Sequence, residues 1–186
     1  MRALGSALAV YELGGRERFT IQAIAKTSGI SVGSLYHHFG SIDGLAAALY
    51  ASCMYHLMSS LAEAVETSKT AKSGILALTR AYLAFTVERP AEARFIHASS
   101  YASFIPAHAS VIEDAKSQAL LRLHTWLATQ VRTGEIRDIP PALFEMIVIG
   151  PVAETARRWL GGARDIDPKE ASRVLPELIW RSVAKA

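Results

Sequence analysis

The sequence has little of what holds a secreted or membrane-embedded protein together. Cys53 is the only cysteine among 186 residues, so no disulfide can form within the chain. The longest stretch without a charged residue, residues 44–62, contains three serines and a histidine, which a lipid-facing helix would bury at a cost. The first residues do not show the basic-then-apolar pattern of a signal peptide. We therefore expect a cytoplasmic protein with no membrane span.

Motifs of several common enzyme classes are also missing. The sequence contains no HExxH zinc motif, no phosphate-binding loop and no dinucleotide-binding glycine motif. His97 precedes Ser99 and Ser100, but the spacing provides no carboxylate to orient the histidine for nucleophilic catalysis. An enzyme is therefore the less favoured alternative, and we expect no cofactor.

A metal sensor is a second alternative, because the chain has six histidines. Cys53 and His56 are three residues apart on one face of a predicted helix. His37 and His38 are adjacent, so they point about 100° apart within a helix and do not chelate one ion easily. Three or four convergent ligands are needed for a protein metal site, and the spacing brings together only one pair. We expect no bound metal.

Apolar residues in helical spacing are abundant. Hydrophobic residues make up 51% of the chain and the mean hydropathy is +0.20, so a core, an oligomer interface or a ligand pocket must bury them. Glycines, prolines and N-capping residues separate the periodic segments, and strand-like alternation is absent. We predict an all-α fold of about nine helices, over residues 3–13, 21–28, 32–39, 42–65, 71–88, 91–100, 106–133, 141–160 and 168–184.

Two short helices joined by a tight turn are predicted within TIQAIAKTSGISVGSLYHHF, residues 20–39. Thr20 and Ser31 are the expected N-caps of the two helices. Gly29 can adopt the left-handed conformation that a sharp turn between them needs. Leu35 lies on the inward face of the second helix. Such a pair is the helix-turn-helix unit, which places its second helix in the major groove of DNA.

The outward face of this unit carries the hydrogen-bonding groups that DNA recognition uses. Gln22 and His37 are candidates for base edges, and Val32 and Gly33 are close enough for contact with a thymine methyl. The net charge of +3 is compatible with nucleic acid but does not argue for it. The predicted DNA-binding residues are Thr20, Gln22, Lys26, Ser31, Val32, Gly33, Ser34, Tyr36, His37 and His38. A helical interaction module that binds no DNA is the alternative, but it leaves this surface unexplained.

Residues 3–50 resemble the DNA-binding domain of the TetR/AcrR family of repressors. The matching segments are FTIQAIAKTSGIS, VGSLYHHFGS and DGLAAAL, with the spacing between them intact. The resemblance implies a helix-turn-helix domain over residues 1–44 and an effector-binding and dimerisation domain over residues 45–186. It also implies a repressor that leaves a palindromic operator on double-stranded DNA when a small molecule binds. Ile42 stands where the family often has a lysine, which removes one expected contact with the DNA backbone.

Dimerisation is expected through the last two helices, which in the resembling family pair with a second subunit. The final helix has an apolar stripe of the required kind. The predicted interface residues are Ile147, Val152, Ala156, Trp159, Val174, Leu175, Leu178 and Ile179. Packing of both stripes on the parent bundle is the alternative. A two-fold homodimer would read two half-sites about 34–36 Å apart, or somewhat more.

An effector pocket is expected between the helices that follow the DNA-binding domain. Its candidates combine large apolar faces with a few polar tips, as small-molecule sites do, although such residues at helical spacing are often simply core. They are Tyr55, Met58, Tyr82, Phe85, Phe95, His97, Tyr101, Phe104, His124, Trp126 and Met146. This set predicts a small apolar or aromatic effector, which would release DNA by favouring a different arrangement of the two subunits.

Overall fold

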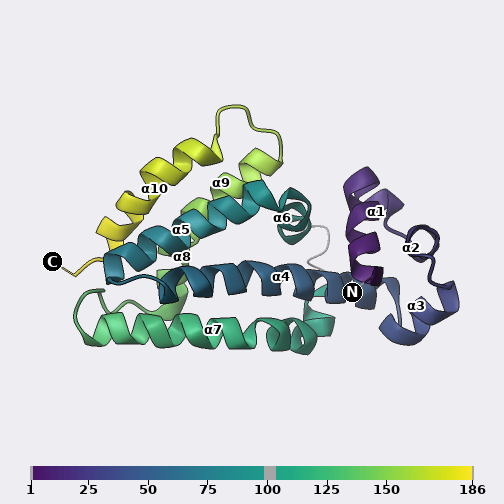
Figure 1. Ribbon diagram of the computed structural model, residues 1–186, viewed down its shortest axis with the longest axis horizontal. Helices are drawn as coiled ribbons and strands as arrows, with labels where there is room; N and C mark the ends of the chain where they lie inside the picture. Colours follow the sequence, from purple (N-terminus) through teal and green to yellow (C-terminus); the bar gives the residue numbers. More distant parts are fainter. Residues whose placement is uncertain (1, 99–103, 186) are drawn as a thin grey trace. The chain divides into compact units, whose positions relative to one another are not determined.

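The computed structural model describes residues 2–98 and 104–185. The described residues form ten α-helices, which confirms the predicted all-α fold (Figure 1). They are α1 (Arg2–Arg18), α2 (Ile21–Ser28), α3 (Val32–Phe39), α4 (Ile42–Glu66), α5 (Ala71–Glu88), α6 (Pro90–His97), α7 (Ala109–Arg132), α8 (Pro141–Val148), α9 (Gly150–Leu160) and α10 (Pro168–Val183). A 3₁₀ turn (Pro106–His108) precedes α7.

Most helices begin and end near the capping and terminating residues that the sequence predicted. Helices α2, α3 and α5 have the predicted bounds, and α1 leaves the helical conformation at Gly14 and Gly15, where a stop was expected. The Asp167 side chain caps α10 by accepting a hydrogen bond from the backbone nitrogen of Lys169 at 2.9 Å. The predicted helix over residues 91–100 is α6, and its last two predicted residues lie outside the described part of the chain.

The prediction of a single helix over residues 141–160 is wrong, because the structure divides this segment into α8 and α9 at Ile149. Pro151 is the physical reason. A proline has no N–H to donate to the carbonyl four residues earlier, and its ring crowds that carbonyl. The backbone nitrogen of Ile149 donates to the carbonyls of both Glu145 and Met146 at the break. This division raises the helix number from nine to ten.

The chain forms two compact units, which are described separately below. Unit 1 consists of Met1–Tyr55 and Ala91–Lys116, and unit 2 consists of His56–Pro90 and Ser117–Ala186. Helices α4 and α7 therefore each contribute residues to both units. By packing, the chain does not divide at residue 44, so the division into a DNA-binding and an effector-binding domain remains a functional prediction.

Unit 1 has one apolar core, to which α1–α4, α6 and the start of α7 contribute. Tyr11 on α1, Phe19 before α2 and Phe95 on α6 pack as a ring cluster. The Tyr11 and Phe95 centroids are 5.0 Å apart at 89°, and those of Phe19 and Phe95 are 5.8 Å apart. Burial raises the pKa of the Tyr11 hydroxyl, partly opposed by the charge of Arg94. Helix α6 is thus packed directly against α1 and Phe19, which precede the helix-turn-helix.

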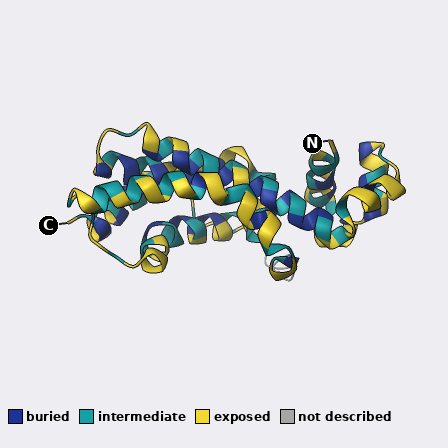
Figure 2. Ribbon diagram, turned by 90° about the horizontal axis from the view of Figure 1, so that it is seen from below, coloured by how far each residue is buried: buried dark blue, intermediate teal, exposed yellow. Residues whose placement is uncertain are grey.

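Unit 2 is a bundle in which α10 packs along α5 and α9 packs against both (Figure 1). Gly74 on α5 permits a close approach of α7. A methyl group at Gly74 would overlap Cζ2 of Trp126 and lie 2.9 Å from its Cη2. The ion pair between Lys72 and Glu177, at 3.0 Å, joins α5 to α10, and a second one joins Glu66 to Arg122. Buried and exposed faces alternate around these helices (Figure 2).

Helix α4 is long and apolar enough to cross a membrane when judged by length and composition alone. Half of its most apolar window is buried within the protein, and Leu45, Leu49, Leu57 and Leu61 are at most 3% exposed. These leucines pack as core residues. Burial within the protein therefore explains the apolar character of α4, which contributes residues to both units.

Candidate nucleic-acid interface

Both ends of helix α2 are capped by the residues from which its bounds were predicted. The Thr20 hydroxyl accepts a hydrogen bond from the backbone nitrogen of Ala23 at 3.2 Å. Gly29 ends the helix with φ +68°, the left-handed conformation that glycine adopts without strain. Ile21 and Ile24, at 3% and 0% exposure, fix the inward face. The polar side of α2, with Gln22 and Lys26, therefore faces outward.

Helix α3 is attached to the protein mainly through one side chain. Leu35 is 1% exposed and is the only fully buried residue of the helix, while Phe39 is half-buried. The Ser31 hydroxyl accepts from the backbone nitrogen of Ser34 at 3.1 Å, and the backbone nitrogen of Gly40 donates to the carbonyl of Tyr36 at 2.8 Å. Both ends are therefore capped, and the rest of the helix is available to a partner.

The structure places all ten predicted DNA-binding residues on the exposed surface of α2, α3 and their caps. Val32 is 37% and Tyr36 is 47% exposed, so both side chains lie on the surface of α3. A methyl group at Gly33 would have nothing within 4 Å. The fold itself therefore does not require glycine at this position of α3.

Residues 29–33, GISVG, also spell the GxSxG pattern of hydrolase nucleophiles. That motif needs a strand before the serine and an exposed hydroxyl after a sharp turn. Here a helix precedes Ser31, and the Ser31 hydroxyl caps α3 and lies 2.9 Å from the Ser34 hydroxyl. The local structure therefore makes this serine a helix cap.

The comparison with protein families agrees with this geometry. Residues 3–49 match the family described as "Bacterial regulatory proteins, tetR family". This match identifies a TetR-type domain within residues 3–49. The match covers about a quarter of the chain and ends within α4. A comparison with curated proteins gives no match.

Solved structures show that the whole chain has the fold of TetR-family regulators. A TetR family transcription regulator from Marinobacter aquaeolei VT8 shares 18% identity at a TM-score of 0.77, covering 100% of this chain and 95% of that one. FadR of Bacillus subtilis, in complex with stearoyl-CoA, shares 18% identity at 0.77, covering 96% of each chain. The ketosteroid regulator KstR2 of Mycobacterium tuberculosis shares 20% identity at 0.68, covering 99% and 94%.

Arg2 is a candidate contact with nucleic acid that the sequence did not indicate. Its guanidinium lies beside Gly29, with Nη2 3.6 Å from where a side-chain carbon of that glycine would stand. The turn between α2 and α3 therefore has a cation from the start of α1 next to it. Sequence distance hides this placement, because 27 residues separate Arg2 and Gly29.

The predicted effector residues belong to both units and differ in burial. Phe95 and Phe104 fill the core of unit 1, whereas Tyr82 and Phe85 on α5 are buried in unit 2. Met58, His97 and Trp126 are half-buried, and Trp126 packs against Gly74. Tyr55, His124 and Met146 are exposed, and Tyr101 lies outside the described residues. The pattern of large apolar residues thus mixed core residues with surface residues.

The predicted dimer residues divide into buried and exposed sets. Val152, Ala156 and Ile179 are at most 4% exposed and lie in the core of unit 2. Ile147, Trp159 and Leu175 are half-buried. Val174 and Leu178 are each 51% exposed on α10. Leu143 and Met146 on α8, at 51% and 68%, are further exposed apolar residues that the prediction did not assign to an interface.

Two metal-site candidates from the sequence do not assemble. Cys53 is buried and His56 is half-buried on α4. Within residues 2–98 and 104–185, no group of three or more histidine, cysteine, aspartate or glutamate side chains is placed to hold a metal ion.

Proposed function

We propose that this chain is a cytoplasmic transcriptional repressor of the TetR family, that it binds a palindromic operator as a homodimer, and that a small apolar or aromatic effector releases it. The observation that carries the proposal is α3. The helix is capped at both ends and anchored by Leu35, and its remaining surface is exposed. A helix that contributes so little to its own core is suited to insertion into the major groove.

The side chains of α2 and α3 support a division of roles. Gln22 and His37 reach base edges, and Val32 provides apolar contact with a thymine methyl. Lys26 and Tyr36 bind phosphate oxygens, as do the serine and threonine hydroxyls nearby. Glycine within a helix costs about 0.5–1 kcal/mol relative to alanine, so an exposed Gly33 with open space around it is explained by close approach of DNA.

The dimer is proposed to form through α8 and α10. These helices pack against each other within unit 2, and each exposes large apolar side chains. They are Leu143 and Met146 on α8 and Val174 and Leu178 on α10. A two-fold axis would bring this surface against its own copy and bury all four residues on both subunits.

The effector proposal is supported by buried aromatic residues in unit 2 and by a ligand-bound structure with the same fold. Tyr82 and Phe85 place aromatic rings inside unit 2 on α5. FadR of Bacillus subtilis, which has the same fold, is found with stearoyl-CoA, an apolar acyl ligand. In unit 1, Phe95 on α6 packs against Tyr11 and Phe19, so an effector that displaces α6 would act on the core behind the DNA-binding helices.

A gel-shift titration tests the proposal. Purified protein is mixed with the DNA that flanks its own gene, and a scrambled fragment of equal length is the control. We expect a selective shift that weakens steeply between about 50 and 200 mM salt, because phosphate contacts release counterions. If the flanking DNA does not shift, selection from genomic fragments supplies the operator. Absence of binding to any DNA at low salt would contradict the proposal and favour a helical interaction module.

A further inference from the structure

An open groove of about 330 Å³ lies between α5 and α10 in unit 2. Leu83 and Pro168 are buried and form its floor. Ala84 and Val87 are exposed and form an apolar wall one turn apart on α5. A volume at the lower end of the range for small-molecule sites fits a compact ligand.

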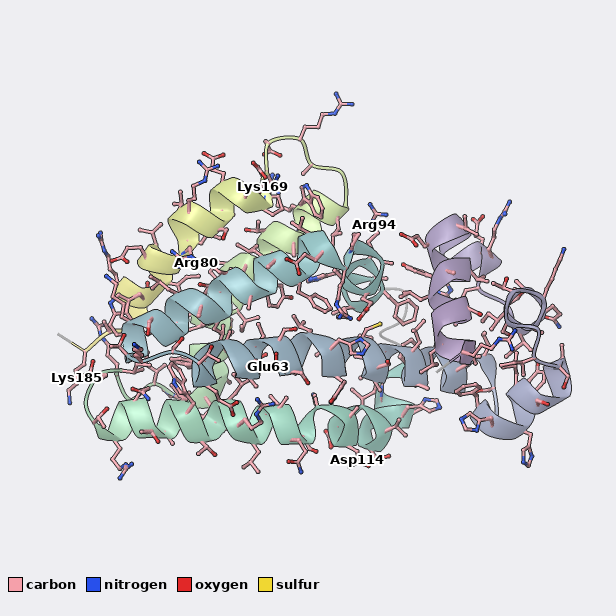
Figure 3. All side chains as sticks on the ribbon, in the orientation of Figure 1. Glu63, Arg80, Arg94, Asp114, Lys169 and Lys185 are labelled. Atoms are coloured by element: carbon pink, nitrogen blue, oxygen red, sulfur yellow. The ribbon has the colours of Figure 1, made fainter. Side chains whose placement is uncertain are left out.

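Two cations, Arg80 and Lys169, flank this groove. Arg80 projects from α5 and Lys169 from the first turn of α10, and both are exposed (Figure 3). Among the described residues, neither forms an ion pair with a carboxylate. The same two helices do form such a pair farther along, between Lys72 and Glu177. The charges of Arg80 and Lys169 are therefore available to a ligand.

Ser172 adds an unused hydrogen-bond donor to the groove. Serines within helices commonly donate to the carbonyl of the preceding turn, as Ser182 on α10 does to Leu178 at 3.0 Å. The Ser172 hydroxyl makes no such bond within the described part of the chain. Two cations and a free hydroxyl thus adjoin an apolar surface.

The groove is distinct from the proposed dimer surface. At about 100° per residue, Lys169 points about 140° around α10 from Val174 and about 180° from Leu178. A partner subunit bound to Val174 and Leu178 would therefore leave the groove open.

We propose that this groove binds a small monocarboxylate with an apolar body. The carboxylate lies between Arg80 and Lys169 and accepts a hydrogen bond from Ser172, because charge-assisted bonds to guanidinium and ammonium groups are the strong ones. The apolar body covers Ala84 and Val87. Glu88 lies eight residues from Arg80, about 12 Å along α5, and disfavours a second negative charge at that end.

Amide NMR on the full-length chain tests this site with 2-naphthoate as the probe and 2-naphthamide as the uncharged probe of matching shape. We expect saturable naphthoate shifts at the backbone amides of Ala84, Val87 and Ser172, with naphthamide binding about tenfold more weakly. The Arg80→Gln/Lys169→Gln variant loses the shifts. The Arg132→Gln control, an exposed arginine on α7, keeps them.

A second variant, Ala84→Trp, fills the groove without removing a charge, and it also abolishes the shifts. Naphthoate shifts that occur only elsewhere, or that persist in either groove variant, would overturn the proposal. Equal binding of naphthamide would overturn the role of the cations. No DNA is present in this experiment, so its failure is distinguishable from a failure of the regulator proposal.

Discussion

Helices α3 and α10 expose opposite kinds of surface. Apart from Val32, the exposed positions of α3 are serine, glycine, tyrosine and histidine, whereas α10 exposes Val174 and Leu178 beside charged residues. Polar tips on a capped helix suit hydrogen-bond acceptors on a nucleic acid. Apolar side chains of the size of valine and leucine suit a dry protein interface. The exposed surface of α3 in unit 1 is therefore suited to nucleic acid, whereas that of α10 in unit 2 is suited to contact with a protein.

The largest expected effect on assembly comes from placing a charge on the α10 surface. Leu178→Glu would bury a carboxylate in the proposed dimer interface, and we expect dimerisation to weaken by about thirtyfold or more. Sedimentation velocity across a concentration series measures this change. Leu121→Glu, at a 61% exposed leucine of α7, is the matched control and should leave the dimer intact. A dimer that survives Leu178→Glu would contradict the role of α10.

Removal of the α3 anchor should cause the largest effect on folding stability. Leu35→Ala leaves a cavity behind the helix, and we expect a loss of about 2–5 kcal/mol in the free energy of unfolding. Chemical denaturation followed by circular dichroism measures it. Val32→Ala, at the exposed start of the same helix, should change stability by less than about 0.5 kcal/mol. Equal effects of the two variants would show that α3 is held in another way.

Gly74 gives a test of close packing in unit 2. Gly74→Ala forces its methyl group against Trp126, and overpacking of this kind costs about 1–3 kcal/mol. The thermal unfolding midpoint should fall accordingly. Trp126→Leu in the same chain should recover part of the loss in a double-mutant cycle. A neutral Gly74→Ala variant would contradict the close approach of α5 and α7.

In unit 1, the same substitution at Gly33 is expected to change stability in the opposite direction from Gly74→Ala. Gly33→Ala meets open space, and we expect stability to rise by about 0.5–1 kcal/mol because alanine favours the helix. DNA affinity should fall in the same variant, because the methyl group stands where DNA approaches. Denaturation and fluorescence anisotropy together measure the two effects. Unchanged DNA affinity would remove Gly33 from the interface.

The smallest effect concerns the ion pair between Glu66 and Arg122. The hydrogen bond from Arg122 is the main cause that lowers the pKa of Glu66 below its ordinary 4.5. A lowered pKa in the folded state stabilises the protein above pH 4.5, and this contribution is lost as pH falls through the folded value. Wild type should therefore lose its advantage over Glu66→Gln on acidification.

Unfolding midpoints measured from about pH 6 to about pH 3 check this ion-pair prediction. The difference should be small, because both side chains are more than a third exposed. Glu63→Gln on the same helix is the control, since Glu63 forms no ion pair within the described residues. An identical pH response of the two variants would contradict the pairing.

Local chemistry explains why the helix-turn-helix was predictable. Thr20, Gly29 and Ser31 act on their own neighbours within three or four residues, so the sequence shows both the helix ends and the turn. The exposed face of α2 and α3 then follows from helical periodicity, because Leu35 and the isoleucines of α2 determine the inward side. Placement of Arg2 beside Gly29 depends on the packing of α1, which local patterns do not encode.

The burial of the predicted effector and dimer residues was less predictable, because packing between elements far apart in the sequence decides it. Val174 and Ile179 belong to one predicted stripe, yet Ile179 packs into the bundle while Val174 stays exposed. An apolar stripe that is wider than the contact with one neighbouring helix contains both buried and exposed residues. Helical periodicity does not distinguish between the two. Phe95 is similar, since only the folded chain shows its ring against Tyr11.

The most direct test of DNA recognition by α3 is selection of bound genomic fragments with two proteins and a control variant. One is wild type and the other carries Tyr36→Ala and His37→Ala, two exposed substitutions that leave Leu35 in place. A Gln118→Ala/Thr125→Ala variant of α7 is the control. We predict that wild type and control select the same palindromic site, whereas the α3 variant selects none at an unchanged unfolding midpoint. Selection of that same site by the α3 variant would contradict recognition of DNA by α3.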